Sequence, residues 1–253
     1  MSSVPRIFVA HDLQADEPVP LEEGQGKYLT RVMRLESGAL VRVFNGRDGE
    51  WKAHVRQESG KRVSVIPETK TREQVKTPDL TLLFAPLKKT RTDFVVEKAC
   101  ELGVRRILPV MTERTQSNRV RTDRLQATVI EAAEQTERMD IPVVEESVSL
   151  TEALSAWDPS RPLYYCDEAG EAHPMATVLA ETEFGPAGLL IGPEGGFSPT
   201  ERHMLRKAPF IVPVTLGPRI LRAETAVVSA LTLWQALVGD WRDHPYLPET
   251  SNG

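Results

Sequence analysis

The stretch that decides the fold runs from Gly188 to Val228: GLLIGPEGGFSPTERHMLRKAPFIVPVTLGPRILRAETAVV. It holds two short apolar segments, 189–191 and 211–214, and each one breaks at a Gly-Pro turn that is followed by a helical pattern. In an open α/β sheet, ligands bind in the crevice beyond the carboxyl ends of the strands. The two glycine-rich loops, 192–196 and 216–219, therefore predict one shared pocket.

The rest of the chain from Leu80 onward alternates between strand and helix patterns, which predicts a mostly parallel sheet with helices outside it. Helical spacing of apolar residues covers 92–102 and 123–138, and Ser198-Pro199-Thr200-Glu201 has the residues of a capped helix start. The last helix, 224–238, is apolar on most sides, so we expect it either at the centre of the fold or against another subunit. The strand candidates are Leu80–Ala85, Arg106–Val110, Ile141–Glu145, Leu163–Cys166, Leu189–Ile191 and Ile211–Val214.

Residues 1–72 have a different texture, with alternating apolar residues and turn signals at 45–49 and 58–61. This pattern predicts a small antiparallel sheet or barrel. A short helix over 22–35 would bring Arg31 and Arg34 onto one face. The polar segment 68–79 has no apolar periodicity and is expected to link the domains. We therefore predict two domains, 1–72 and 73–253.

The bulk composition describes an ordinary soluble protein of 253 residues with a formal net charge of −5. Residues 86–124 nevertheless carry ten Lys/Arg against five Asp/Glu, which is either a phosphate-binding face or a solvated helix surface. The two cysteines, Cys100 and Cys166, form no C-x-x-C motif, and no signal peptide or membrane-spanning run is evident. The sequence predicts a cytoplasmic protein without a membrane contact.

Several kinds of site are excluded by their missing motifs. The chain has no Walker phosphate loop, no G-x-G-x-x-G dinucleotide fingerprint, no G-x-S-x-G nucleophile elbow and no H-E-x-x-H metal motif, so no metal is expected. What remains is a pocket built largely of backbone, suited to a flat ligand such as an adenine. Glu194 offers a carboxylate to a cationic group, and Arg219, Arg222 and Glu224 lie where the second loop meets the last helix. Alternatively, both loops are plain turns and Arg222 and Glu224 form a surface ion pair.

Two segments, LLIGPEGGFSPTE (189–201) and LGPRILRAETAVVSAL (216–231), resemble the signature of the RsmE family of bacterial rRNA methyltransferases, which belongs to the SPOUT superfamily. The resemblance extends to 96–115, 131–144, PRIF (5–8) and RVMRL (31–35). It implies a trefoil-knotted parallel-sheet methyltransferase domain with an N-terminal PUA-like β-barrel. It also implies methyl transfer from S-adenosylmethionine to N3 of a uridine in the 16S rRNA of the small ribosomal subunit, by a homodimer with the active site near the subunit interface.

The resemblance also assigns residues in this sequence. One departure from the family is Tyr28, which stands where the family often has His three residues before the Arg of its RVLR-like motif; a tyrosine can still stack on RNA or donate to it. The cofactor loops become Leu190, Gly192, Glu194 and Gly196 in the first, and Leu216, Gly217, Ile220 and Leu221 in the second. RNA contacts are expected from Arg6, Tyr28, Arg31, Arg34, Lys88, Lys89, Arg91 and Arg114.

The expected mechanism depends on the N3–H of the uridine, a weak acid that is mostly protonated at neutral pH. A cation aimed at a uracil carbonyl would stabilise the developing negative charge, and Arg222 is the first candidate for that catalytic role. Glu224 or Glu194 either acts as the base or orients Arg222. The alternative functions are a non-catalytic rRNA-binding protein with a vestigial cofactor pocket and an α/β enzyme that uses a nucleotide phosphate.

Overall fold

The computed structural model describes residues 4–58, 62–117, 120–168 and 172–244, and its internal contacts divide the chain into two units. The N-terminal unit contains 1–76 together with 133–141, and the second, called the catalytic unit after the methyltransferase domain that the resemblance implies, contains 77–132 and 142–253. The segment 133–141, which the sequence analysis placed in the second domain, thus packs with the first. Residues 59–61 of the predicted turn at 58–61 lie outside the described residues.

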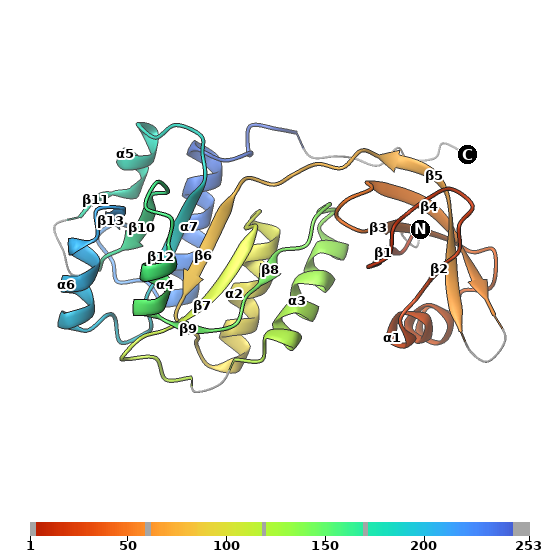
Figure 1. Cartoon of the computed structure of the whole chain (residues 1–253), viewed down its shortest axis with the longest axis horizontal. Coiled ribbons are helices and arrows are strands. Elements are labelled where there is room, and N and C mark those ends of the chain that lie inside the picture. Colours follow the sequence, from red (N-terminus) through yellow and green to blue (C-terminus); the bar gives the residue numbers. More distant parts are fainter. Residues whose placement is uncertain (1–3, 59–61, 118–119, 169–171, 245–253) are drawn as a thin grey trace. The chain divides into compact units, whose positions relative to one another are not determined.

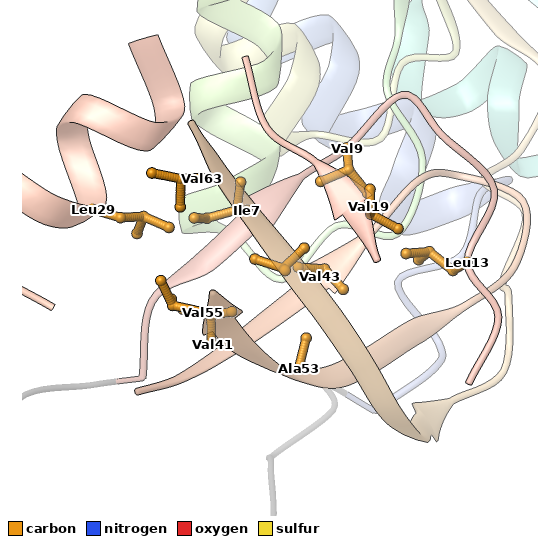
Figure 2. Close-up of a cluster of buried hydrophobic side chains, with 11 residues drawn as sticks. Ile7, Val9, Leu13, Val19, Leu29, Val41, Val43, Ala53, Val55 and Val63 are labelled. Atoms are coloured by element: carbon orange, nitrogen blue, oxygen red, sulfur yellow. The ribbon is translucent and has the colours of Figure 1, made fainter. Parts of the chain in front are cut away.

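The N-terminal unit is built on a five-stranded sheet in the order β1-β3-β4-β5-β2. β1 runs parallel to β3, and the other neighbours pair antiparallel. Inward-facing side chains such as Val41, Val43 and Val65 are fully buried and form its core with Leu29 (Figure 2). Its elements are β1 (Arg6–Phe8), β2 (Val19–Pro20), α1 (Glu23–Lys27), η1 (Tyr28–Val32), β3 (Leu40–Phe44), β4 (Glu50–Gln57) and β5 (Val63–Arg72).

The polar linker predicted for 68–79 is wrong in its first part, because β5 continues to Arg72. The outer half of β5 is largely exposed, so it shows no apolar alternation, yet it pairs with β4 up to the partners Arg72 and Glu50. The strand extends through these polar residues because its backbone amides and carbonyls pair with those of β4, and this pairing depends little on the side chains.

The helix predicted over 22–35 is shorter and changes its winding. α1 passes directly into the π-helical turn η1, in which the amide of Met33 donates to the carbonyl of Tyr28 at 3.0 Å. Arg34 then adopts a left-handed backbone, with φ 56°, and the amide of Leu35 closes the end on the carbonyl of Leu29 at 2.9 Å. Arg31 and Arg34 therefore do not share a helix face, although both side chains are exposed.

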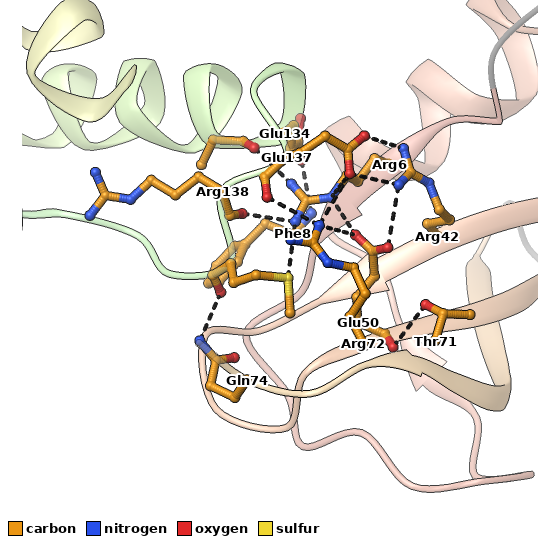
Figure 3. Close-up of polar contacts among 12 residues, drawn as sticks. Arg6, Phe8, Arg42, Glu50, Thr71, Arg72, Gln74, Glu134, Glu137 and Arg138 are labelled. Carbon is orange, nitrogen blue, oxygen red and sulfur yellow. Dashed lines mark hydrogen bonds and ion pairs between the residues drawn. The ribbon is translucent and has the colours of Figure 1, made fainter. Parts of the chain in front are cut away.

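A buried polar cluster in the N-terminal unit explains why 133–141 belongs to it (Figure 3). The guanidinium of Arg6 pairs with Glu50 at 2.5 Å and donates to the carbonyl oxygens of Ala133 at 2.7 Å and Arg138 at 2.8 Å. Glu137, in the same segment, accepts two hydrogen bonds from Arg42, at 2.7 and 2.5 Å. Charge-assisted hydrogen bonds thus hold the segment 133–141 against the strands.

The catalytic unit is built on a parallel sheet in the order β11-β13-β10-β12-β6-β7-β8, with β9 paired to β7 (Figure 1). Every residue of the central strands β6 and β12 is buried, which is typical of a parallel sheet covered on both faces. The elements of this unit are β6 (Leu80–Phe84), α2 (Lys89–Glu101), β7 (Arg106–Met111), α3 (Thr122–Gln135), β8 (Val143–Val144), β9 (Val148–Ser149), α4 (Leu150–Ala156), β10 (Leu163–Cys166), β11 (His173–Pro174), α5 (Met175–Ala180), β12 (Ala187–Ile191), α6 (Pro199–Lys207), β13 (Ile211–Thr215) and α7 (Ala223–Leu237).

The predicted strands of this unit are confirmed at β6, β7, β10, β12 and β13, whereas the segment predicted over 141–145 is reduced to the two residues of β8. Helices α4 and α6 cover one face of the sheet, where their side chains pack with Leu83, Leu163 and Leu190. The last helix, α7, packs against α2, α5 and β12, and its Trp234 is fully buried. Of the two positions predicted for this helix, the central one is confirmed by these contacts.

Candidate cofactor pocket and active site

The carboxyl ends of β10, β12 and β13 open into one pocket of about 670 Å³. β12 ends in the first glycine loop and β13 in the second, so the crevice lies where strand topology predicts a ligand site. The lining residues are Arg91, Tyr165, Cys166, Asp167, Glu168, Ile191, Gly192, Pro193, Glu194, Gly196, Phe197, Arg202, Val214, Thr215, Leu216, Gly217, Pro218, Arg219, Ile220, Leu221, Arg222, Ala223 and Ala226.

The first loop needs its glycines because the neighbouring atoms come too close for a side chain. A Cβ atom at Gly192 would lie 2.6 Å from the ring of Phe197, which is buried. Gly196 has φ 65°, and a Cβ atom there would lie 2.1 Å from Oε1 of Glu168. The main chain of the loop therefore forms part of the pocket wall, as a site for a flat ligand requires.

The helix that follows this loop begins as its sequence indicates. Ser198 accepts a hydrogen bond from the amide of Glu201 at 3.1 Å, and Glu201 accepts one from the amide of Ser198 at 2.8 Å. The hydroxyl of Ser198 is thus engaged in a capping box, with Pro199 in the first turn. This engagement agrees with the absence of a nucleophile motif at Ser198.

Three contacts tie the first loop to two other segments of the catalytic unit. Arg91 in the first turn of α2 forms an ion pair with Glu194, and Arg114 donates to the carbonyl oxygen of Gly195 at 2.8 Å. Glu201 also accepts a hydrogen bond from the amide of Glu113 at 2.8 Å. Arg91 and Arg114, both predicted to contact RNA, therefore have partners in the cofactor loop.

The second loop brings Arg222 to the pocket as the residue that precedes α7. Its side chain is exposed, and among the described residues no ion pair joins it to Glu224. Glu224 is partly buried in the first turn of α7, and its Oε2 atom is buried without a hydrogen-bond partner in the described part of the chain. The surface ion pair considered as an alternative is thus not formed.

The structure brings seven of the eight predicted cofactor residues to this pocket. The exception is Leu190, whose side chain is fully buried in the core beneath the loop and does not line the pocket. Of the two predicted catalytic residues, Arg222 lines the pocket and Glu224 does not. Whether these residues bind the cofactor and act in catalysis stays a prediction.

Sequence reasoning missed the wall that follows β10. Residues 165–168 line the pocket, and the buried carboxylate of Asp167 accepts a hydrogen bond from Arg206 at 2.8 Å. Burial raises the pKa of the Cys166 thiol to about 12, and burial with the neighbouring Asp167 raises the pKa of Tyr165. Both shifts favour the neutral form of the side chain. The signal available in the sequence was the polar pair Asp167-Glu168 directly after a strand.

The predicted RNA-contact residues fall into three groups, and the first, Arg91 and Arg114, has the partners in the first loop described above. Tyr28, Arg31, Arg34, Lys88 and Lys89 have exposed side chains, and their role stays a prediction. The prediction for Arg6 is wrong, because its side chain is only 2% exposed and all of its interactions described above are internal. A guanidinium that is buried and paired in this way cannot reach a phosphate.

No helix among the described residues is long and apolar enough to cross a membrane. Within the same residues, no group of three or more His, Cys, Asp or Glu side chains is arranged to hold a metal ion.

Comparisons with known proteins agree with this architecture. The family model of an RNA methyltransferase domain matches residues 74–235, and that of an RNA methyltransferase PUA domain matches 21–68. The ribosomal RNA small subunit methyltransferase E of Rickettsia conorii is 30% identical over 89% of this chain and 93% of its own length, and that of Synechocystis is 30% identical over 92% and 78%.

Solved structures show the same fold. The ribosomal RNA small subunit methyltransferase E of Neisseria gonorrhoeae, bound to S-adenosylmethionine, is 28% identical and covers 94% of this chain and 99% of its own, with a TM-score of 0.83. A methyltransferase from Legionella pneumophila, also bound to S-adenosylmethionine, is 29% identical with a TM-score of 0.82 and covers 94% of this chain and 100% of its own. The predicted SPOUT-type α/β domain on a parallel sheet with an N-terminal PUA-like domain is confirmed, the trefoil knot stays a prediction, and the chain belongs to the family of ribosomal RNA small subunit methyltransferases E.

Proposed function

We propose that this chain methylates N3 of one uridine in the 16S rRNA of the small ribosomal subunit, with S-adenosylmethionine as the methyl donor. The observation that carries the proposal is the glycine-walled pocket at the ends of three parallel strands, with the exposed guanidinium of Arg222 at its margin. Gly192 and Gly196 line this pocket, and a Cβ atom at either position would meet Phe197 or Glu168, so the wall there is bare main chain, which fits the flat adenine of that cofactor.

The bound cofactor supplies a methyl group made electrophilic by its sulfonium. The chain has to hold the uridine in line with that methyl group and to favour the N3 anion, and correct placement alone lowers the barrier by several kcal/mol, roughly. We assign the stabilisation of this anion to Arg222, which lines the pocket and whose donors have no partner among the contacts of the described residues. A donor aimed at a uracil carbonyl stabilises negative charge as it develops.

Of the two carboxylates that are candidates for orienting Arg222, the contacts favour Glu224. Glu194 is paired with Arg91, so part of its capacity to accept protons or hydrogen bonds is already used. Glu224 has a buried oxygen without a partner among the described residues, and it lies two positions after Arg222 at the start of α7. We propose that Glu224 orients Arg222 once the substrate is bound.

The test of the chemistry is a pair of variants in one loop. Arg222→Ala should lower kcat for labelled-methyl transfer to methyl-deficient small subunits by about 100- to 1000-fold, the cost of removing one donor to a developing anion, while cofactor binding stays measurable. Arg219→Ala is the matched control, because Arg219 is exposed and lines the same pocket three residues away. If Arg222→Ala keeps its kcat, Arg222 does not stabilise the anion. If the wild type transfers no methyl group, a non-catalytic rRNA-binding role gains support.

We propose that the N-terminal unit contacts rRNA through the surface around η1. Tyr28 is 47% exposed and Arg31 and Arg34 are exposed beside it in sequence, which joins an aromatic face to two cations. Arg31→Glu combined with Arg34→Glu should weaken binding to small subunits and lower its salt dependence. Arg56→Glu, an exposed arginine on β4, controls for the general change of charge.

We also propose that the chain works as a homodimer. The motivating feature is apolar surface in the catalytic unit: Ile220 in the second loop is 83% exposed, and Phe184 and Trp241 are 70% and 49% exposed. Sedimentation equilibrium should report twice the mass of one chain, and Ile220→Asp should shift the measured mass toward that of a single chain. A monomeric wild type at micromolar concentration would contradict the dimer. The cytoplasmic location stays a prediction.

A further inference from the structure

We infer that Arg91 and Arg114 are positioning residues that hold the first glycine loop in its cofactor-binding form, and that they are not phosphate contacts. The inference rests on the proposed function, because it takes the pocket at this loop as the cofactor site. Both arginines belong to the basic segment 86–124, which on charge alone is either an RNA-binding face or solvated surface. Their contacts indicate a third role.

The tip of the loop is held at two consecutive residues, Glu194 and the first of the two glycines that follow it. Glu194, before them, pairs with Arg91, and the two side chains are 31% and 36% exposed. The carbonyl of Gly195 itself accepts the hydrogen bond of Arg114 at 2.8 Å. Glycine has no side chain through which it could be held, so the guanidinium fixes the path of the backbone by binding the main-chain oxygen itself.

A third contact comes from the same turn as Arg114. The amide of Glu113 donates to Glu201 at 2.8 Å, and Glu201 is 5% exposed and caps α6 at the end of the loop. The turn is closed on itself, since the amide of Thr115 donates to the carbonyl of Thr112 at 3.1 Å. The loop is therefore anchored at its tip and at its end to the turn 112–115, which follows β7.

The physical value of these anchors follows from the glycines. Gly195 and Gly196 have more backbone freedom than other residues, and a free loop would lose that freedom each time the cofactor binds. Contacts that order the loop beforehand remove this cost from binding and so raise affinity. Neither arginine has to touch the cofactor for this effect.

The two roles predict different measurements. A phosphate contact contributes to RNA affinity and to its salt dependence, and removing one lowers the salt slope by about one. A positioning residue changes cofactor affinity and leaves the salt slope for RNA as it was. The Arg91–Glu194 pair adds a further test, because Glu194 matters for the anchor and has no role in binding a phosphate.

The experiment is a double-mutant cycle on the full-length protein, read by calorimetric titration with S-adenosylhomocysteine. Arg91→Ala and Glu194→Ala should each raise Kd about 5- to 20-fold, and the double variant should raise it no further than the larger single effect, as expected for two residues that act through one contact. The exchanged pair, Arg91→Glu with Glu194→Arg, should recover most of the affinity. Arg114→Ala should raise Kd by a similar factor, while Arg105→Ala, at an exposed arginine of the same basic segment, should leave it unchanged.

Salt-dependent binding to small subunits is measured for the same variants, and the slope should match that of the wild type. Additive effects of Arg91→Ala and Glu194→Ala, or unchanged Kd values with a reduced salt slope, would overturn the inference while the cofactor pocket stands. A folded wild type that binds no S-adenosylhomocysteine would overturn the proposed pocket, and the positioning role with it.

Discussion

Replacing Arg6 by Ala tests whether this arginine is a structural centre of the N-terminal unit. Its side chain is 2% exposed, pairs with Glu50 at 2.5 Å and lies 3.7 Å above the ring of Phe44. It also donates to two carbonyl groups of 133–141. The substitution removes all of these contacts together and leaves two buried carbonyl oxygens without their donor.

The expected loss is about 3–5 kcal/mol, the usual cost of removing one partner from a buried ion pair. Glu50 is 1% exposed and keeps Arg42 at 3.3 Å, which offsets part of its charge and places the value toward the lower end of that range. Arg6→Lys keeps the charge but loses the forked geometry, so it should fall between the wild type and Arg6→Ala. Burial lowers the pKa of Arg6, although the hydrogen bond and charge of Glu50 act to raise it.

The assay is native-state hydrogen exchange followed by mass spectrometry, because a chain with two units need not unfold in one step. Amides of β3, β4 and β5 should exchange about 100- to 3000-fold faster in Arg6→Ala, the equivalent of the expected loss at tenfold per 1.4 kcal/mol. Amides of β6 and β12 serve as the internal reference. Arg31→Ala, an exposed arginine of the same unit, should change protection by less than about threefold. Wild-type protection in Arg6→Ala, together with weaker RNA binding, would refute the structural role and restore the phosphate contact.

Three further outcomes follow from the same structure. Gly192→Ala should raise the Kd for S-adenosylhomocysteine at least about tenfold, because its Cβ atom would meet the buried ring of Phe197, whereas Gly185→Ala, with no atom within 4 Å of the added carbon, should leave calorimetric binding unchanged. Burial alone would raise the pKa of Glu137, but the hydrogen bond and charge of Arg42 hold this pKa below its ordinary 4.5. The stabilising effect of the ionised carboxylate is therefore complete above pH 4.5 and is lost as the pH falls through the lowered pKa. Glu137→Gln should thus flatten the acid limb of a stability–pH curve measured on the N-terminal unit. Arg34→Gly should raise the stability of that unit by roughly 0.5–1 kcal/mol in denaturant titrations, since Gly adopts the left-handed backbone of position 34 without the steric cost, and it should weaken binding to small subunits; a destabilised variant would contradict the strain.

The pocket was predictable because its parts are local in sequence. Each of the two glycine loops follows an apolar run of a few residues and precedes a helix, and parallel strands bring their carboxyl ends to one edge of the sheet. The start of α6 was predictable for the same reason, since its capping box lies within four consecutive residues. The family resemblance then named the cofactor, which the residue pattern had described only as a flat ligand.

The features that were missed depend on partners far away in the sequence or on backbone pairing. Arg6 meets Ala133 and Arg138 across 127 and 132 positions, so no local pattern distinguishes it from a surface arginine. The same contacts make the N-terminal unit discontinuous, which a linear division at residue 72 does not anticipate. Strand β5 extends through polar residues, and the short helices α4 and α5 offer too few turns for a clear periodicity.

These partners also decide which of the predicted functional charges are available to a substrate. Arg6, Arg91 and Arg114 were equivalent to Arg31 and Lys88 in the sequence, but among the described residues only the first three meet acceptors inside their own units. Internal pairing thus separates structural cations from those free to meet phosphate, and net charge cannot do so.

Internal pairing also distinguishes the charged residues of the proposed active site. Glu194 is paired with Arg91. Two residues apart at the start of α7, Arg222 has an exposed guanidinium and Glu224 a buried oxygen that meets no donor in the described part of the chain. An unpaired buried acceptor costs free energy in the free protein, so a state in which Arg222 turns toward both Glu224 and a uracil carbonyl satisfies the carboxylate and the developing anion together. On this reasoning, the substrate completes the site, and Glu224→Gln should lower kcat more than it raises KM.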